Sequence, residues 1–283
     1  MIEFRNVTKD YSRTVAFNDF SMTIEQPGIY CLLGRNGAGK TTMLKMLAGH
    51  IEATSGSVAV NNNQVSMMAM PQNVYFAGSA ASQFNVKLKE LFHIAAEINN
   101  SFDTDFALKL AKRLRLDLEK RYKQLSFGMK ALTNTLIALA SNKEILLLDE
   151  PMLGIDPVMR KTFYELLEEN CAGKSKIIIV STHIIDEIEK VAERLLIIDH
   201  GRLVVHCAMS EIDEKAYSVT GPAEQVKSAT EGLNVIGEIT AGGFLSRHVY
   251  DKRIDDGDRY SVAALSLQDF FIALVGDERG QPV

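Results

Sequence analysis

Residues 34–42 read Gly-Arg-Asn-Gly-Ala-Gly-Lys-Thr-Thr, between an apolar run at 29–33 and a segment at 43–48 with apolar residues at helical spacing. A buried strand, a glycine-rich turn and a helix are therefore expected in succession. The glycines let the backbone wrap closely around an anion, and the N–H groups at the start of the helix point toward it. Lys40 is expected to reach the β- and γ-phosphates of a nucleotide, and the Thr41 hydroxyl to bind Mg²⁺. The stretch predicts a phosphate-binding loop, the alternative being a tight strand-to-helix turn without a ligand.

The composition is that of an ordinary globular protein. The 283 residues are 46% hydrophobic and 24% charged, and the net charge of −5 argues mildly against a nucleic-acid-binding surface. The acidic excess lies in residues 211–283, which hold 13 acidic and 7 basic side chains. This change predicts a domain boundary near residue 210, with domains at 1–210 and 211–283.

Cysteine usage and apolar runs predict where the protein works. The three cysteines have no metal-ligand spacing, which fits a reduced cytosolic protein. No charged and then apolar leader opens the sequence, so export is not expected. The longest apolar runs are far shorter than the ~18 residues that a membrane-spanning helix needs. Any role at a membrane is therefore expected to come through a partner.

Residues before and after the loop predict a sheet and a helical insert. Residues 1–8 and 16–24 are predicted to form a hairpin, in which Tyr11 either stacks on a flat base or simply ends a strand. Strands are also predicted at 57–60 and 65–70, the second with methionines that fill gaps in the core. Gln72 follows in a polar loop, and the helical spacing of residues 82–123 predicts a small helical insert.

Polar residues stand at the ends of two further apolar runs. Asp149 and Glu150 follow the run 145–148, and His183 follows the run 177–180. In open α/β sheets, ligands bind at the carboxyl ends of the strands. An acidic pair there is costly to bury unless a cation or a reacting water compensates it. The alternatives are a solvated turn before Pro151 and a solvent-facing histidine.

The order of these motifs resembles that of the ATP-binding-cassette (ABC) ATPases over about residues 1–210. The motifs are the loop at 34–42, Gln72 after a strand, Leu-Ser-Phe-Gly-Met at 125–129, Leu-Leu-Leu-Asp-Glu-Pro at 146–151, Gly-Ile-Asp at 154–156 and Ser-Thr-His at 181–183. The resemblance implies an α/β phosphate-loop fold with a mixed or parallel central sheet, an antiparallel β subdomain and a helical subdomain at about 73–130. Residues 211–283 are then a small α/β appendage, regulatory or dimer-stabilising.

The resemblance implies a role for each matching residue in binding and hydrolysing ATP. Glu150 would polarise the attacking water, His183 would contact the γ-phosphate, and Gln72 would sense it. Mg²⁺ would lie among Thr41, Gln72 and Asp149. The remaining nucleotide-binding residues would be Tyr11, stacked on adenine, and Gly34, Asn36, Gly37, Ala38, Gly39, Lys40 and Thr42 around the phosphates.

A second copy of the chain is implied, because one ABC cassette carries only half of each ATP site. Ser126 and Gly128 would close on the ATP bound by the other chain, and Asp156 would touch that chain. Phe127 and Met129 complete the nucleotide-binding signature. Phe127 and Met129 depart from the usual Leu-Ser-Gly-Gly-Gln signature, which puts a polar contact at residue 129 in doubt. The helix after the signature also lacks the usual Gln and Arg. All phosphate, metal and water positions are filled, so an active ATPase is expected.

The leading functional hypothesis is the ATPase subunit of an exporter with separate membrane permease chains, at the cytoplasmic face of the membrane. The Ser-x-Gly-Met-Lys signature and residues 265–271 both resemble such cassettes. Peptides or other amphipathic compounds would be the cargo. The insert side chains Phe84, Leu88, Leu91 and Phe92 are candidates for the wall of a permease-docking groove, the alternative being that some of them pack the insert itself. The alternatives are an importer cassette, a soluble ABC ATPase acting on nucleic acid or the ribosome, and a phosphate-loop kinase or GTPase. No nucleic-acid partner is expected.

Overall fold

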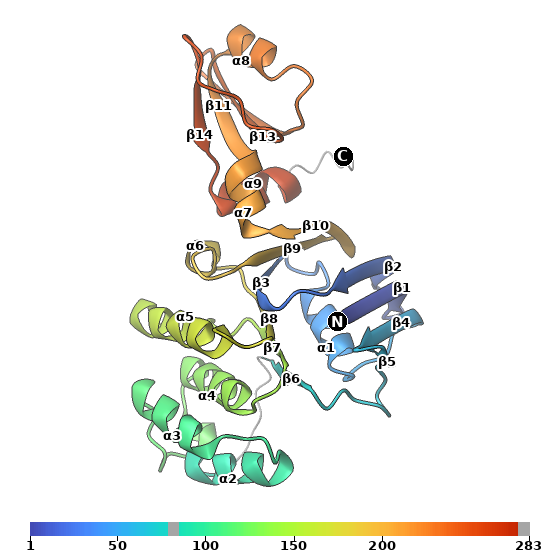
Figure 1. Ribbon diagram of the computed structural model, residues 1–283, viewed down its shortest axis with the longest axis vertical. Coiled ribbons are helices and arrows are strands. Elements are labelled where there is room, and N and C mark those ends of the chain that lie inside the picture. Colours follow the sequence, from blue (N-terminus) through green and yellow to red (C-terminus); the bar gives the residue numbers. More distant parts are fainter. Residues whose placement is uncertain (79–84, 277–283) are drawn as a thin grey trace.

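The computed structural model describes residues 1–78 and 85–276 (Figure 1). Within these residues the strands form an N-terminal antiparallel sheet, a central sheet and a C-terminal antiparallel sheet. The N-terminal sheet has the order β2-β1-β4-β5, with β1 at Ile2–Asp10, β2 at Val15–Ile24, β4 at Ser55–Val60 and β5 at Asn63–Gln64. Alternate side chains of β1 and β2, such as Phe4 and Phe20, are buried, as the alternating sequence predicts.

The central sheet has the order β10-β9-β3-β8-β7-β6 and is parallel from β9 to β6, while β10 is antiparallel to β9. Its strands are β3 (Gly28–Leu33), β6 (Val74–Ala77), β7 (Ile145–Asp149), β8 (Ile177–Ser181), β9 (Arg194–Asp199) and β10 (Arg202–Ala208). Every residue of β3, β7 and β8 is buried, which explains their continuous apolar runs. Their parallel direction brings the carboxyl ends of all three to one edge of the sheet.

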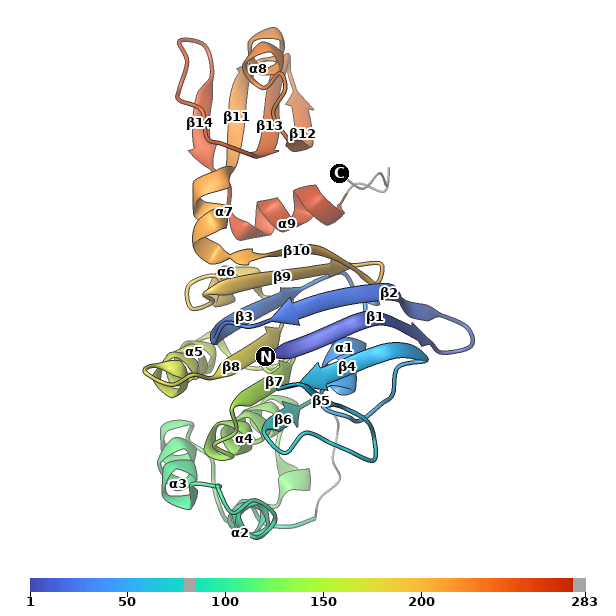
Figure 2. The same ribbon diagram turned by 45° about the vertical axis from the view of Figure 1, so that its right-hand side comes forward.

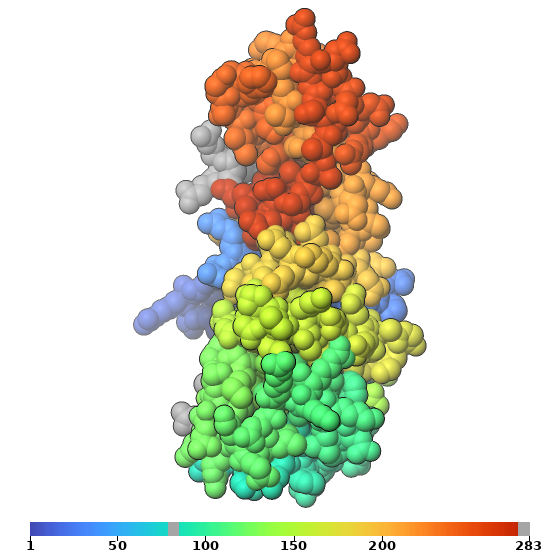
Figure 3. Space-filling model, turned by 90° about the vertical axis from the view of Figure 1, so that its left-hand side faces the viewer, coloured from blue at the N-terminus to red at the C-terminus, as the bar shows by residue number. Residues whose placement is uncertain are grey.

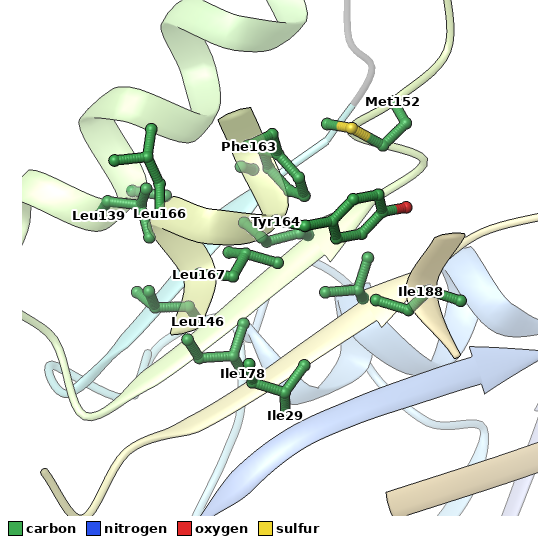
Figure 4. Close-up of a cluster of buried hydrophobic side chains, with 14 of the residues drawn as sticks. Ile29, Leu139, Leu146, Met152, Phe163, Tyr164, Leu166, Leu167, Ile178 and Ile188 are labelled. Atoms are coloured by element: carbon green, nitrogen blue, oxygen red, sulfur yellow. The ribbon is translucent and has the colours of Figure 1, made fainter. Parts of the chain in front are cut away.

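The two faces of the central sheet are covered differently. The helix α1 (Lys40–Leu47) and the N-terminal sheet cover one face, where Leu32, Leu147 and Ile179 lie in their shared core. The helices α4 (Phe127–Ala140), α5 (Pro157–Cys171) and α6 (Ile185–Ile188) cover the other face. Figure 4 shows this second core, in which Leu167 of α5 lies over Leu146 and Ile178 of the sheet, and Leu166 lies beside Leu139 of α4. Burying each such side chain contributes about 1.5–3 kcal/mol to the free energy of folding. The packed layers on both faces hold the strands in place, and with them the carboxyl ends that form one edge of the sheet.

The insert between β6 and α4 is helical, as predicted, over residues 85–125. It consists of α2 (Leu88–Ile98), α3 (Thr104–Arg113) and the 3₁₀ turn η1 (Tyr122–Gln124). The side chains of Leu88, Leu91 and Phe92 are buried in the core that the insert shares with α4, so these three pack the insert and their assignment to a permease contact is wrong. Phe84 lies outside the described residues.

The prediction of a strand at 65–70 is also wrong. These residues form bends between β5 and β6, and Ser66 and Ala69 bond each other's backbone. Met68 is 94% exposed, and Met67 and Met70 are about half exposed, so the methionines do not fill the core. The strand of this region is β6, which starts after Gln72 and pairs with β7.

The C-terminal residues form a sheet of their own in the order β12-β13-β11-β14 (Figure 2). The elements are α7 (Met209–Lys215), β11 (Ala216–Pro222), α8 (Ala223–Ala229), β12 (Val235–Ala241), β13 (Phe244–Tyr250), β14 (Ser261–Ala264) and α9 (Leu267–Val275). One face of the sheet packs on α8, and α9 lies between the sheet and the nucleotide domain. Leu267 and Phe270 of α9 belong to the same core as α6. The domain division at residue 210 remains a prediction.

The molecule is elongated, with the helical insert at one end and the C-terminal sheet at the other (Figure 3). Across residues 1–78 and 85–276, none of the helices combines the length and apolar character needed to cross a membrane.

Candidate active site

The loop at 34–39 joins β3 to α1, and at Gly34 and Gly39 its backbone leaves no room for a side chain. Gly39 has φ +108°, a conformation that other residues rarely adopt, and a Cβ there would lie 2.6 Å from the ring of Phe17. A Cβ on Gly34 would clash with the carbonyl of Ile198 in β9. The loop, including Asn36, Gly37 and Ala38, is thus held against the sheet, with the first turn of α1 opening from it.

Lys40 and Thr41 begin α1 and turn toward the loop and β7. The Lys40 ammonium donates to the carbonyls of Gly34, at 2.6 Å, and Arg35, at 3.3 Å. Burial lowers the pKa of Lys40, while the carboxylates of Glu150 and Asp149 act in the opposite direction. A cation partly stripped of water beside unpaired helix N–H groups is suited to binding phosphate.

Asp149 ends β7 and is almost fully buried, so its two oxygens need partners. The Thr41 hydroxyl donates to Oδ2 at 2.8 Å, and the Ser181 hydroxyl donates to Oδ1 at 2.7 Å. A hydroxyl and a carboxylate this close offer the oxygen ligands that Mg²⁺ prefers. The residues present therefore fit a magnesium ion held by Thr41 and Asp149.

Glu150 and His183 come together at the same edge, from the ends of adjacent strands. Oε2 of Glu150 lies 2.8 Å from Nδ1 of His183. Both side chains are partly exposed, Glu150 by 23% and His183 by 57%. A carboxylate that faces solvent, with its orientation fixed by an imidazole, can accept a hydrogen bond from water beside a phosphate.

Tyr11 lies beside the start of α1. Its hydroxyl is 3.4 Å from Oγ1 of Thr42, and the Lys9 ammonium lies 4.9 Å from the centre of its ring. The residue is 46% exposed. An exposed ring next to the phosphate loop can stack on a base. The position of Tyr11 therefore suits the stacking role better than that of a residue that simply ends a strand.

The signature residues form a second cluster. Ser126 caps α4 by accepting from the N–H of Met129, and Asp156 caps α5 by accepting from the N–H of Val158 and of Met159. A Cβ on Gly128 would clash with the carbonyl of Gly154, so the two helix starts meet closely. Between them lies a groove of about 410 Å³ lined by Leu114, Arg115, Ser126, Gly128, Met129, Leu132, Gly154, Ile155, Asp156, Val158 and Met159. The described lining of this groove includes no residue of the loop at 34–42.

Phe127 faces a different cavity from its neighbours Ser126 and Gly128. Its half-exposed ring lines a smaller cavity, together with Asp149, Glu150, Ala77 and Gly78. This cavity lies between the start of α4 and the carboxyl end of β7 within one chain. Phe127 is not among the residues that line the Ser126 groove.

Gln72 is not at the site, so its prediction as a magnesium ligand and γ-phosphate sensor is wrong. It precedes β6, and its neighbour Asn73 accepts a hydrogen bond from the N–H of Ile145 at the start of β7. Asp149 stands at the other end of β7, roughly 13 Å away at strand spacing. Among the described residues of this segment, Ala77 and Gly78 at the carboxyl end of β6 line the cavity beside Asp149 and Glu150.

Two residues that lie at these clusters are not among the predicted site residues. Ser181 belongs to the Ser-Thr-His motif at 181–183 and its hydroxyl bonds to Asp149. Arg115 lines the signature groove with φ +53°, and nothing in the local sequence distinguishes it from the other basic residues of the insert.

Comparison with known proteins identifies this arrangement. The family described as ABC transporter matches residues 17–153. The ABC transporter ATP-binding protein YtrB of Bacillus subtilis is 31% identical over 218 residues, which are 76% of this chain and 74% of YtrB. The chain belongs to the ABC transporter ATP-binding proteins. It is the ATP-binding subunit of an ABC transporter, and it is an ATPase.

Other ABC proteins are similar over different lengths. The Nod factor export ATP-binding protein I of Burkholderia orbicola is 28% identical over 98% of this chain and 97% of its own length. The dimeric structure of MJ0796, a bacterial ABC transporter cassette, has a TM-score of 0.65 at 21% identity and covers 74% of this chain and 99% of its own. CbiO1 from Clostridium perfringens, part of the ABC transporter complex CbiONQ, has a TM-score of 0.62 at 23% identity, covering 75% of this chain and 89% of its own. The ABC cassette fold is thus shared with these structures.

Proposed function

We propose that two copies of the chain bind two ATP molecules between them, head to tail, and use hydrolysis to drive a separate membrane permease. The observation that carries the proposal is the separation of two half-sites in one chain. The phosphate loop, Asp149, Glu150 and His183 share one edge of the sheet, whereas Ser126, Gly128 and Asp156 line a different groove. MJ0796, which has a similar fold, has a dimeric structure.

In each half-site the chain's own residues would divide the work. The loop N–H groups and Lys40 would neutralise the phosphates, and Tyr11 would stack on the base. Thr41 and Asp149 would hold Mg²⁺, which would withdraw charge from the phosphates. Glu150 would accept a hydrogen bond from the attacking water, and His183 would fix the direction of the Glu150 carboxylate. Phosphoryl transfer to water depends chiefly on such positioning and charge stabilisation.

The second chain would make closure depend on ATP. The N–H groups at the start of α4 and the hydroxyl of Ser126 would meet the γ-phosphate bound by the first chain. Since these contacts exist only in the closed pair, ATP would favour closure and hydrolysis would release it. That cycle gives the transporter a source of motion.

Export is the direction we propose, at the cytoplasmic face of the membrane. Support comes from the signature form and from the similarity to the Nod factor export protein along nearly the whole chain. The lantibiotic transport protein SrtF of Streptococcus pyogenes is also similar, at 27% identity over 90% of its own length. The cargo we propose is a peptide or another amphipathic compound.

The test of the transporter proposal is isolation of the complex from native membranes in mild detergent. The tagged wild-type chain and its Glu150→Gln variant, the second loaded with ATP, should each retain a polytopic membrane protein. A chain carrying Lys40→Ala serves as the control for nucleotide-dependent differences. Recovery of the chain alone, in every nucleotide state, would contradict the proposal.

A further inference from the structure

Ser181 stands where the metal-binding and water-binding carboxylates meet. It is the last residue of β8, is completely buried, and pairs in register with Asp149 of β7. Its hydroxyl donates to Oδ1 of Asp149 at 2.7 Å and accepts from the backbone N–H of Glu150 at 3.0 Å. One hydroxyl therefore contacts both acidic residues of the site.

These contacts fix the direction of each carboxylate in a different way. With Ser181 on Oδ1, Asp149 directs Oδ2 at the hydroxyl of Thr41. The Ser181 hydroxyl donates its proton to Asp149, so a lone pair of the hydroxyl oxygen can accept from the N–H of Glu150. These two bonds together fix one orientation of the hydroxyl. Asp149 is too deeply buried for water to replace this partner freely.

The backbone of Glu150 needs such support. Its φ of +50° is left-handed, which is uncommon for a residue with a side chain. The N–H of Glu150 is shared between the hydroxyl and the carbonyl of Ser181, at 3.0 and 3.1 Å. This conformation directs the carboxylate of Glu150 to His183. A surrounding structure that holds a strained backbone is typical of functional sites.

We propose that Ser181 is a positioning residue for ATP hydrolysis, whose hydroxyl orients Asp149 toward the metal site and holds the backbone of Glu150. The inference rests on the proposed roles of Asp149 and Glu150. Partners of metal ligands of this kind change metal affinity or activity by about 10–100-fold when removed. Ser181 itself is too deeply buried to contact the nucleotide.

The test measures how much Mg²⁺ improves the binding of a fluorescent ATP analogue, together with kcat and KM for ATP. Ser181→Ala should lose most of the Mg²⁺-dependent gain in affinity and about 10–100-fold in kcat, while binding in EDTA stays near that of the wild type. Ser181→Thr, which keeps the hydroxyl, should restore both quantities. Ser141→Ala is the matched control, because Ser141 is as buried as Ser181 and its hydroxyl donates to the carbonyl of Ala138 at the end of α4, away from both acidic residues.

The outcomes separate this inference from the proposal on which it rests. Asp149→Asn should also abolish the Mg²⁺-dependent gain. If it does so while Ser181→Ala behaves like the wild type, the positioning role is overturned and the role of Asp149 stands. If Asp149→Asn itself keeps the gain, the proposed metal site fails.

A second pair of variants keeps the test decisive if Ser181→Ala does not fold. Ser181→Thr and Ser181→Val have the same shape, and only the first has a hydroxyl. A larger Mg²⁺-dependent gain for the threonine variant supports the inference, and equal gains overturn it. Thermal unfolding of both variants without nucleotide shows whether stability differs between them.

Discussion

Glu150 and His183 illustrate what single residues reveal. Each follows a short apolar run that is a buried strand in the structure, and parallel strands bring their carboxyl ends to one edge. The sequence predicts each of them at the carboxyl end of a strand, and in the structure their side chains are in contact. Their roles in hydrolysis stay proposals.

Replacing Glu150 tests its role directly. Glu150→Gln keeps the shape of the side chain but removes the charge that would polarise water. Phosphate release should fall by about 10²–10⁴-fold, while ATP stays bound. Steady-state phosphate release and filter binding of labelled ATP measure the two effects. Turnover at the wild-type rate would remove Glu150 from this role.

Gly37 and Gly39 allow the cost of a positive φ to be measured separately from the cost of a steric clash. Both have positive φ, but a Cβ on Gly37 would meet no atom within 4 Å, whereas one on Gly39 would meet Phe17. Gly37→Ala should lower the free energy of unfolding by about 1–2 kcal/mol. Gly39→Ala should cost about 1–3 kcal/mol more, because the packed ring must move. Urea unfolding without nucleotide measures both.

The control for this comparison is Phe17→Leu. It should reduce the difference between the two alanine variants, since the smaller side chain leaves room for a Cβ at residue 39. Equal destabilisation by the two glycine substitutions would show that the contact with Phe17 is unimportant.

At the scale of elements, the buried strands of the central sheet that were predicted correctly have a local signature, and β6, which was placed wrongly at 65–70, does not. The buried strands β3, β7 and β8 are continuous apolar runs with a motif at the end. Residues 65–70 and Val74–Ala77 are both apolar and short, and Pro71 separates them. Only pairing with β7, far along the chain, decides which of them becomes the strand. Because Val74–Ala77 is the strand, Gln72 lies in the turn before it, and not at the end of a strand as predicted.

The corrected position of Gln72 has a measurable consequence. Gln72→Ala should leave the ATPase rate within about twofold of the wild type, because a change of 0.4 kcal/mol or less in the barrier is expected of a residue outside the site. Phosphate release at saturating ATP and Mg²⁺ is the measurement, with Glu150→Gln as the inactive reference. A loss of tenfold or more would return Gln72 to the site.

At the scale of the whole molecule, charge distribution indicated a change near residue 210 but could not show how the last helix packs. α9 returns to the nucleotide domain, where Leu267 and Phe270 join the core around α6. Its first N–H donates to the carboxylate of Glu189, just beyond α6. The helix α6 in turn follows His183 closely. The C-terminal sheet is thereby joined to the segment that carries a proposed catalytic side chain.

The central claim is that each ATP site is completed by a second chain. Ser126→Arg places a long cation in the signature groove and should suppress hydrolysis while ATP still binds. Lys40→Ala should suppress it by weakening phosphate binding. A pair made of one chain of each kind contains one whole site, because the intact loop of the first chain faces the intact signature of the second.

The decisive measurement is therefore the ATPase rate of an equal mixture of the Ser126→Arg and Lys40→Ala chains, each of which is inactive alone. Random pairing should restore activity up to about a quarter of the wild-type rate, since half of the pairs are mixed and each has one whole site. Mixing either variant with more of itself is the control. An inactive mixture, in which differently tagged chains are shown to pair, would contradict the shared site.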